Sequence, residues 1–322
     1  MTKRILTILV TITAVAGISG AARQAAPATT PADVRRILSA LADDSMEGRA
    51  SGTRGAQRAA RYIGAQMRRI GLEPLGDSGY FQRVPLSPDT FPASKRYPAV
   101  NVLGVIRGSD PALKNEYVLV DAHYDHLGIG PAVKGDSIYN GADDDASGVT
   151  AVLEIARQLI SGPKPKRTIV FAAMMGEEVG LIGTSWYIAH PPIPLERMAA
   201  NLEIEMIGRP DSLAGGAGRA WLTGYARSTM GDELAAKGIP IVADRRLDQH
   251  FFERSDNIAF AQRGIPAHTL SSFNLHSDYH QPTDDITKVD FMHMAGVINA
   301  GARAVRLLTD GPKPEWKPGG RP

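Results

Sequence analysis

Cysteine is absent from the 322 residues of this chain. Its absence excludes disulfide bonds, thiolate metal sites and cysteine nucleophiles, so any metal ion must be held by His, Asp and Glu. A strong excess of one charge is lacking too, because 36 Lys and Arg balance 34 Asp and Glu to a net charge of +2. Neither a nucleic-acid-binding surface nor an acidic tail is therefore expected.

Long apolar runs are lacking beyond the amino terminus. There, Lys3 and Arg4 precede the apolar residues 5–18 and the small residues 19–22, which is the three-part pattern of a secretory signal peptide. The alternative is a membrane anchor, but the run is shorter than the ~20 residues that span a bilayer. We expect residues 1–22 to be removed, and the mature protein to be periplasmic or secreted without stable membrane association.

The rest of the chain divides into three parts by composition. Residues 23–30, rich in Ala, Pro and Thr, are predicted to form a linker. Residues 31–310 hold the periodic segments and are predicted to form a single domain. Residues 311–322, which are rich in Gly and Pro, are predicted to be a disordered tail.

Hydrophobic periodicity predicts alternating helices and strands within residues 31–310. The predicted helices are 31–41, 55–70, 149–159, 181–188, 230–237 and 291–308. The predicted strands are 80–86, 100–106, 117–121, 168–174, 200–206, 219–223 and 267–271. Apolar strands separated by helices favour an α/β fold, with a mainly parallel or mixed twisted sheet and helices on both faces.

His and acidic residues recur where these strands end, which is where ligands bind in such sheets. Five motifs carry them: His123-Tyr124-Asp125, the run from Gly141 to Gly148 (GADDDASG), Gly176-Glu177-Glu178, the run from Glu205 to Arg209 (EMIGR), and Asp278-Tyr279-His280. Each alone is weak evidence, because loops are usually polar. Together, two His and several carboxylates suit zinc.

The run of three Asp residues has a competing interpretation as a calcium-binding EF-hand loop, since Asp143, Asp145 and Glu154 fit that spacing. An EF-hand requires an incoming helix, whereas residues 135–141 have the composition of a loop. Ser147 and Gly148 are better read as the start of a helix. We therefore reject the calcium loop.

In order and spacing, the five motifs resemble metallopeptidase family twenty-eight, the co-catalytic di-zinc aminopeptidases of the bacterial leucyl aminopeptidase and glutamate carboxypeptidase type. The resemblance extends from about residue 45 to residue 305. It implies the zinc aminopeptidase fold, two Zn²⁺ ions per chain, and a catalytic domain over residues 31–310. The activity that it implies is hydrolysis of amino-terminal residues from peptides, through a water that both ions share.

The resemblance also implies the metal ligands. One zinc would be held by Asp144, Glu178 and His280. The other would be held by His123, Asp144 and Glu205, so that Asp144 bridges the two ions.

Two further residues receive catalytic roles from the resemblance. Glu177 would be the general base, and Asp125 would orient His123. The family usually has a cis peptide bond after the bridging aspartate, here between Asp144 and Asp145.

The fifth ligand departs from the family's pattern, which commonly has Asp at this position. The sequence reads Asn201-Leu202-Glu203-Ile204-Glu205, and both Glu residues lie on the same face of the predicted strand. Glu205 is nearer the carboxyl end and directly precedes the Met-Ile-Gly-Arg run, so we favour it over Glu203.

Two other functions remain as alternatives. A glutaminyl cyclase, a single-zinc acyltransferase of the same fold, would not need His123 as a ligand. A catalytically inactive binding domain should lack ligands or the base, and none is missing. The sequence leaves open the roles of His126 and His276, the preferred terminal residue, the oligomeric state and the identity of both metals.

Overall fold

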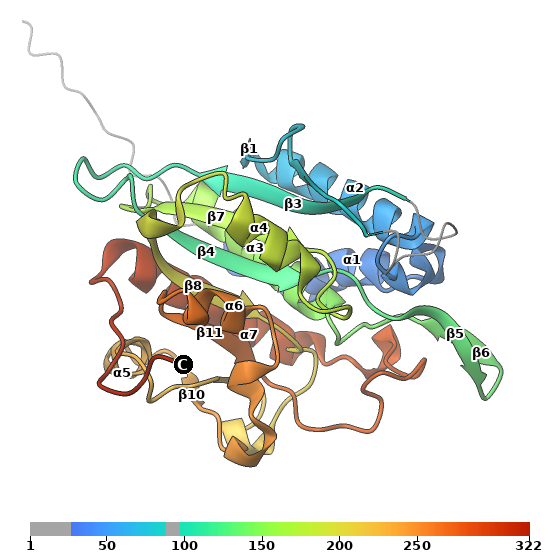
Figure 1. Ribbon diagram of the computed structural model, residues 1–322. Coiled ribbons are helices and arrows are strands. Elements are labelled where there is room, and N and C mark those ends of the chain that lie inside the picture. Colours follow the sequence, from blue (N-terminus) through green and yellow to red (C-terminus); the bar gives the residue numbers. More distant parts are fainter. Residues whose placement is uncertain (1–26, 88–96) are drawn as a thin grey trace, which may run out of the picture.

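The computed structural model describes residues 27–87 and 97–322 (Figure 1). The predicted signal peptide and residues 23–26 of the predicted linker lie outside the described residues. The helices are α1 (Pro31–Leu41), α2 (Arg54–Ile70), α3 (Ala146–Ser161), α4 (Ile182–Ala189), α5 (Met230–Ala236), α6 (Asn257–Gln262) and α7 (Phe291–Asp310). The strands are β1 (Glu73–Pro74), β2 (Phe81–Val84), β3 (Ala99–Ile106), β4 (Tyr117–His123), β5 (Gly128–Val133), β6 (Asp136–Tyr139), β7 (Thr168–Met174), β8 (Met198–Ile204), β9 (Ala220–Leu222), β10 (Ile241–Ala243) and β11 (Ala267–Ser271).

One mixed sheet organises the part of the chain that the structure describes. Its strands follow the order β1-β3-β7-β4-β8-β11-β9-β10, and β2 pairs with β3. The four central strands β7, β4, β8 and β11 are mutually parallel. Strand β3 runs antiparallel to β7, and β9 runs antiparallel to β11. The carboxyl ends of the four central strands therefore meet at one edge of the sheet.

Helices cover both faces of the sheet (Figure 1). Along β4, Val118 and Val120 pack into the core beneath α1, α2, α3 and α7. The alternate residues Tyr117 and Leu119 pack into a second core with residues of α4 and α6. The central strands are buried on both faces, which explains why they read as continuous apolar runs rather than as alternating ones. The predicted α/β fold, with a mainly parallel or mixed sheet and helices on both faces, is confirmed.

Two boundaries matter for the site. Strand β8 ends at Ile204, so Glu205 is the first residue beyond it. Helix α3 begins at Ala146, three residues before the predicted start, because Asp145 caps it by accepting a hydrogen bond from the N–H of Gly148 at 2.8 Å. Helix α6, the β5–β6 hairpin and the short strands β1 and β10 were not predicted, because they are short or weakly periodic.

The prediction of a disordered tail at residues 311–322 is wrong. The indole Nε1–H of Trp316 donates to the carbonyl oxygen of Gly264 at 2.9 Å. The backbone N–H of Lys317 donates to the carbonyl oxygen of Arg227 at 2.9 Å. The Trp316 ring also contacts the ring of Phe252, with centroids 6.4 Å apart. Composition alone indicated disorder, but one aromatic anchor and backbone hydrogen bonds hold the segment against the domain.

The described end of the predicted linker is also anchored. The hydroxyl of Thr29 donates to Glu154 at 3.0 Å, and its backbone N–H donates to Asn299 at 2.9 Å. Thr30 then caps α1. Within residues 27–87 and 97–322, no helix combines the length and apolar character needed to cross a membrane.

Candidate metal centre

Asp144 lies at the centre of the predicted site. Its Oδ1 is 3.2 Å from Nε2 of His123, and its Oδ2 is 3.1 Å from Nε2 of His280. The described residues hold two groups of potential metal ligands, and Asp144 belongs to both: His123, Asp144 and Glu205 form one, and His126, Asp144, Glu178 and His280 form the other. The structure thus brings together all five residues that the resemblance implied as ligands.

These side chains come from loops at the carboxyl edge of the sheet. His123 ends β4, and Glu178 follows β7. Glu205 follows β8, and His280 lies in the segment after β11. Parallel strands bring these segments together although they are far apart in sequence.

The residues beside Asp144 in the chain hold its loop in place. Asp143 accepts hydrogen bonds from the N–H of Gly208 at 2.6 Å and from His276 at 2.9 Å. Asp284 accepts from the N–H groups of Asp143 and Asp144, each at 3.1 Å. The peptide bond between Asp144 and Asp145 is cis, as the resemblance implied. Asp143 is thus bonded to neighbouring loops, which leaves no basis for a calcium loop here.

Glu177 and Asp125 are joined through the backbone. The carboxylate of Asp125 accepts hydrogen bonds from the N–H groups of Gly176 at 2.8 Å and Glu177 at 3.2 Å. Its other oxygen accepts from the hydroxyl of Ser51 at 2.7 Å. Nδ1 of His123 lies 3.1 Å from the carbonyl oxygen of Asp125, nearer than the carboxylate at 3.8 Å.

The structure distinguishes Glu205 from Glu203. Glu205 lies 4.0 Å from Nε2 of His123. Glu203 is fully buried and points to α6 and β11, where it accepts hydrogen bonds from the N–H groups of Asp256 and Asn257 and from the hydroxyls of Ser255 and Thr269. Its oxygens are occupied by these donors, so Glu205 is the residue that faces the centre.

Buried carboxylates give this centre an unusual electrostatic character. Burial raises the pKa of Glu177 to about 10, with Glu205, Asp256 and Glu178 adding repulsion against the attraction of His123. Burial, together with Glu203, raises the pKa of Glu205 to about 8. Burial opposes the ionisation of Asp144 too, but His126, His123 and His280 hold its pKa well below the ordinary value.

The donor set fits metal ions. Nε2 of His123 and Nε2 of His280 are buried, and neither makes a hydrogen bond with any residue that the structure describes. Both atoms face the carboxylate of Asp144. Unpaired ring nitrogens aimed at acidic oxygens are the arrangement that zinc requires, and bound cations would offset the carboxylate repulsion.

Four further histidines lie near the centre or in the core of the fold. His126, whose role the sequence left open, contacts Glu178 at 2.8 Å inside the centre. His276 contacts Asp143 outside both groups. His268 and His293 are buried and hydrogen-bonded to Ser228 and Ser272, respectively, as expected of structural histidines.

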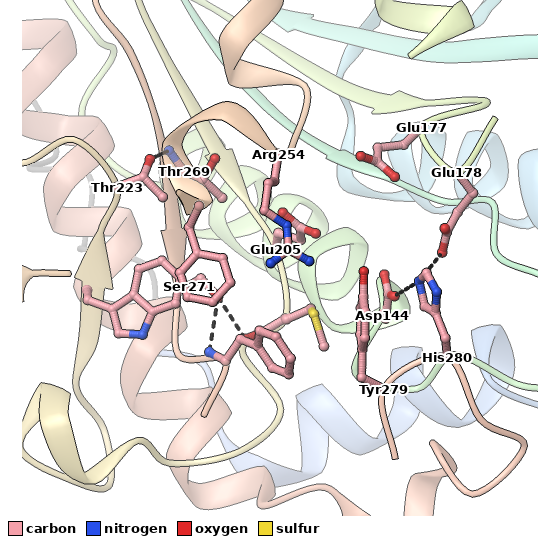
Figure 2. A pocket seen from close by; sticks show the side chains of 14 residues that line it. Asp144, Glu177, Glu178, Glu205, Thr223, Arg254, Thr269, Ser271, Tyr279 and His280 are labelled. Carbon is pink, nitrogen blue, oxygen red and sulfur yellow. Dashed lines mark hydrogen bonds and ion pairs between the residues drawn. The ribbon is translucent and has the colours of Figure 1, made fainter. Parts of the chain in front are cut away.

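An aromatic cleft opens beside the centre (Figure 2). The Trp221 ring stacks on Phe251 with centroids 5.1 Å apart, and Phe273 contacts both Phe251 and Tyr279. In Figure 2, Arg254 and Glu205 lie between Thr223 and Thr269 on one side and Glu177 and Glu178 on the other. Sequence periodicity gave no signal for this cleft, because its rings come from separate segments of the chain: β9, the segment before α6 and the segment after β11.

A mixed α/β sheet with two overlapping groups of His and carboxylate ligands at its carboxyl edge is typical of metal-dependent hydrolases. The family model for peptidase family M28 matches residues 101–303. The chain belongs to peptidase family M28, which confirms the resemblance seen in the motifs.

Curated relatives and solved structures agree with this assignment. The chain is 36% identical over 110 residues to aminopeptidase YwaD of Bacillus subtilis, covering 34% of this chain and 22% of that protein. It is 27% identical over 310 residues to the probable lipoprotein aminopeptidase LpqL of Mycobacterium tuberculosis, covering 83% of this chain and 56% of that protein. The matches thus span about a fifth of one relative's length and just over half of the other's.

The fold is similar to that of a zinc aminopeptidase from Bacillus subtilis, with a TM-score of 0.66, 17% identity and coverage of 87% of this chain and 95% of that one. It is equally similar to a glutaminyl cyclase from Porphyromonas gingivalis, with a TM-score of 0.65, 17% identity and coverage of 87% and 99%. At this level of identity the likeness shows the fold alone, so the site must distinguish the two activities.

Proposed function

We propose that this chain is an exported di-zinc aminopeptidase that hydrolyses amino-terminal residues from peptides. The observation that carries the proposal is the position of Asp144, whose two oxygens face His123 and His280 at 3.2 and 3.1 Å. One carboxylate thereby serves two ligand groups. His123 belongs to the second group, and a single-zinc cyclase would have no use for it as a ligand.

The residues would divide between the two ions as follows. Asp144, Glu178 and His280 hold one ion, and His123, Asp144 and Glu205 hold the other. Zinc, when bound, supplies Lewis-acid activation of a water molecule and of the scissile carbonyl group. The carboxylates supply the negative charge that keeps both cations in place.

Glu177 is the proposed general base. Its carboxylate lines the cleft and belongs to neither ligand group. The raised pKa of Glu177 would fall with cations bound at the neighbouring ligands, because they would offset the repulsion from the other carboxylates. Ionised Glu177 then takes a proton from the attacking water and passes it to the departing amine. The N–H bonds to Asp125 fix the backbone from which Glu177 extends.

The cleft accounts for action at a chain end. Its aromatic rings offer a pocket for one apolar side chain, and the carboxyl groups of Glu177 and Glu205 line the same cleft, where, once cations keep them ionised, they could bind a substrate ammonium group. The hydroxyl of Tyr279 stays neutral because burial raises its pKa, so it can donate a hydrogen bond to a substrate carbonyl.

The test is metal content and hydrolysis measured on one purified sample of the mature chain. Two zinc ions per chain, and cleavage of aminoacyl anilides but not of their amino-blocked versions, are expected. Chelation should abolish the cleavage. One zinc with cyclisation of amino-terminal glutamine would establish the cyclase instead. A chain that binds no metal and shows no activity would be a binding domain.

Export is tested separately. When the full-length chain is expressed with its own amino terminus, the mature protein should be recovered outside the cytoplasm and should begin near residue 23. A full-length chain that stays in the cytoplasm would contradict the signal peptide and leave the proposed activity untouched.

A further inference from the structure

His126 occupies a rigid position next to the metal centre. The residue is 2% exposed, and its backbone N–H donates to the carbonyl oxygen of Arg49 at 3.4 Å. The fully buried guanidinium of Arg49 in turn donates to the carbonyl oxygens of Tyr124 at 2.8 Å and Gly141 at 2.9 Å. One arginine thereby fixes the loop that carries His126 and the loop that carries Asp144.

Gly141 leaves room for the imidazole ring of His126. A Cβ atom at position 141 would lie 2.6 Å from ring carbons of His126, and the backbone there has a φ of +54°. Any side chain at this position would displace the ring. The fold therefore holds the ring against a glycine, with Nδ1 directed at the carboxylates of the centre.

The ring is directed at the ligand group that contains His280. Nδ1 of His126 is 2.8 Å from Oε1 of Glu178 and 3.7 Å from Oδ2 of Asp144. Nε2 of His280 is 3.3 Å and 3.1 Å from the same two oxygens. Four ligands of a tetrahedral zinc ion lie about 3.3 Å apart, given bonds of about 2.0–2.1 Å. The four atoms thus have the spacing of one tetrahedral shell.

The geometry points to His126 as a fourth protein ligand of the metal position formed by Asp144, Glu178 and His280. This inference rests on the proposed di-zinc function. It makes the two positions unequal. One has four protein ligands, which complete a tetrahedral shell, whereas the other has only His123, Asp144 and Glu205 and keeps a place free for water or substrate. The four-ligand position should hold zinc more tightly.

The competing arrangement is a hydrogen bond from Nδ1–H of His126 to Glu178 without metal contact. Nε2 of His126 has no hydrogen-bond partner among the described residues. It would lack one whether Nδ1 binds the metal or donates to Glu178, so Nε2 does not separate the two arrangements. The distinction therefore depends on Nδ1. The replacement His126→Asn separates the two, because the Asn amide can donate to Glu178 from nearly the same place but is a poor zinc ligand.

The experiment uses the mature chain after metal removal. Zinc affinities are measured by competition with a chromophoric chelator, and Co²⁺ absorption reports the coordination number of the position that fills first. We expect two unequal zinc affinities for the unaltered chain. The tighter one should weaken about a hundredfold or more in His126→Asn, and the visible Co²⁺ bands of the first equivalent should lose intensity.

Two further variants complete the design. His123→Asn should weaken only the looser affinity. The control His190→Asn replaces an exposed histidine that stacks on Trp186, away from the centre, and should change neither affinity. The inference would be overturned if both zinc affinities of His126→Asn stayed within about threefold of those of the unaltered chain and the Co²⁺ spectrum did not change. His126 would then be only a hydrogen-bond donor to Glu178.

X-ray absorption on the unaltered chain loaded with one equivalent of zinc needs no variant, so it remains decisive if His126→Asn does not fold. Two imidazoles at the zinc ion are expected, and a single imidazole would overturn the inference. An unaltered chain that binds no metal would overturn this inference and the proposed function together. One that binds two ions and cleaves peptides, but shows a single imidazole, would overturn only the role of His126.

Discussion

The carboxylate of Asp125 accepts a hydrogen bond from the backbone N–H of Glu177 at 3.2 Å. Asp125 follows β4 and Glu177 follows β7, and these strands are parallel neighbours in the sheet. The bond therefore joins two carboxyl-end loops and fixes the point from which the candidate base extends. Asp125 also contacts His123 through its carbonyl oxygen, so one residue positions both a proposed metal ligand and the proposed base.

This relationship predicts a catalytic effect of Asp125→Asn. The Asn amide has only one accepting oxygen. Its NH₂ group would face either the Ser51 hydroxyl or the N–H groups of Gly176 and Glu177, and would lose the hydrogen bonds on that side. We expect kcat to fall about 10- to 100-fold while KM changes little, as for other partners that orient a site. The comparison variant Ser51→Ala removes one of the donors to Asp125 and should have a smaller effect. A folded Asp125→Asn enzyme with unchanged kcat would remove Asp125 from this role.

Glu177→Gln tests the base directly. The amide cannot accept the proton of the attacking water, so kcat should fall about 10²- to 10⁴-fold. Zinc content should stay the same, because Glu177 belongs to neither ligand group. Glu196→Gln, at an exposed position in the turn before β8, is the matched control and should keep full activity. Turnover retained by Glu177→Gln would assign the proton transfer to another group.

Glu203 and Glu205 should respond differently to the same change. Glu205→Gln removes a charge facing His123, so zinc affinity and activity should fall while the fold stays stable. Glu203→Gln replaces a carboxylate that accepts four hydrogen bonds with an amide that has only one accepting oxygen. It should lower the free energy of unfolding by about 2–4 kcal/mol. Denaturant titration of the metal-free proteins and zinc competition measure the two effects. Equal loss of zinc affinity in both variants would contradict the assignment of Glu205.

Strand ends indicated from sequence where a metal centre would lie, but the resemblance to the family was needed to assign individual ligands. His123 ends one buried apolar strand, and Glu178 and Glu205 follow two others; such strands are recognisable from one sequence. The sequence already favoured Glu205 over Glu203, and the structure supplies the physical reason. Donors from the segment before α6 and from β11 occupy the oxygens of Glu203, whereas Glu205, just beyond β8, faces His123.

The cleft and the tail lay beyond sequence reasoning for a different reason. Trp221, Phe251 and Phe273 meet only when β9, the segment before α6 and the segment after β11 are packed together. The tail has the composition of disordered segments, and one tryptophan overrides that tendency. Tertiary contacts between distant loops leave no periodic trace in the chain.

The tail contacts predict that Trp316→Ala destabilises the fold. The half-buried indole ring contacts Phe252 and His268, and its N–H bonds to Gly264. Its loss should lower the free energy of unfolding by about 2–3 kcal/mol. Lys313→Ala, at an exposed position in the same segment, is the control and should be neutral. Equal stability of Trp316→Ala and the unaltered chain would show that the tail does not hold to the domain in solution.

The last prediction concerns the pH dependence of stability, which His268 should influence. Nδ1–H of His268 donates to the carbonyl oxygen of Thr223 at 2.7 Å, so Nε2 must accept from the hydroxyl of Ser228 at 2.7 Å. This arrangement requires the neutral ring. Burial lowers the pKa of His268 to about 4, against the hydrogen bond to Thr223.

The sign of the effect follows from proton binding. Between the ordinary histidine pKa of about 6.5 and the folded value, the unfolded chain binds a proton that the folded chain does not. The free energy of unfolding should therefore be fully present above about pH 6.5. It should fall by at most about 3 kcal/mol as the pH drops toward the folded value of about 4.

Denaturant titrations of the metal-free chain between pH 4 and pH 8, a range set by these two pKa values, measure the effect against His268→Asn. Metal-free protein is used because zinc binding itself depends on pH. The variant should be less stable near pH 8, and the difference from the unaltered chain should shrink as the pH falls, because the variant has no ring to protonate. A constant difference between His268→Asn and the unaltered chain over this range would mean that the His268 ring does not resist protonation in the folded protein.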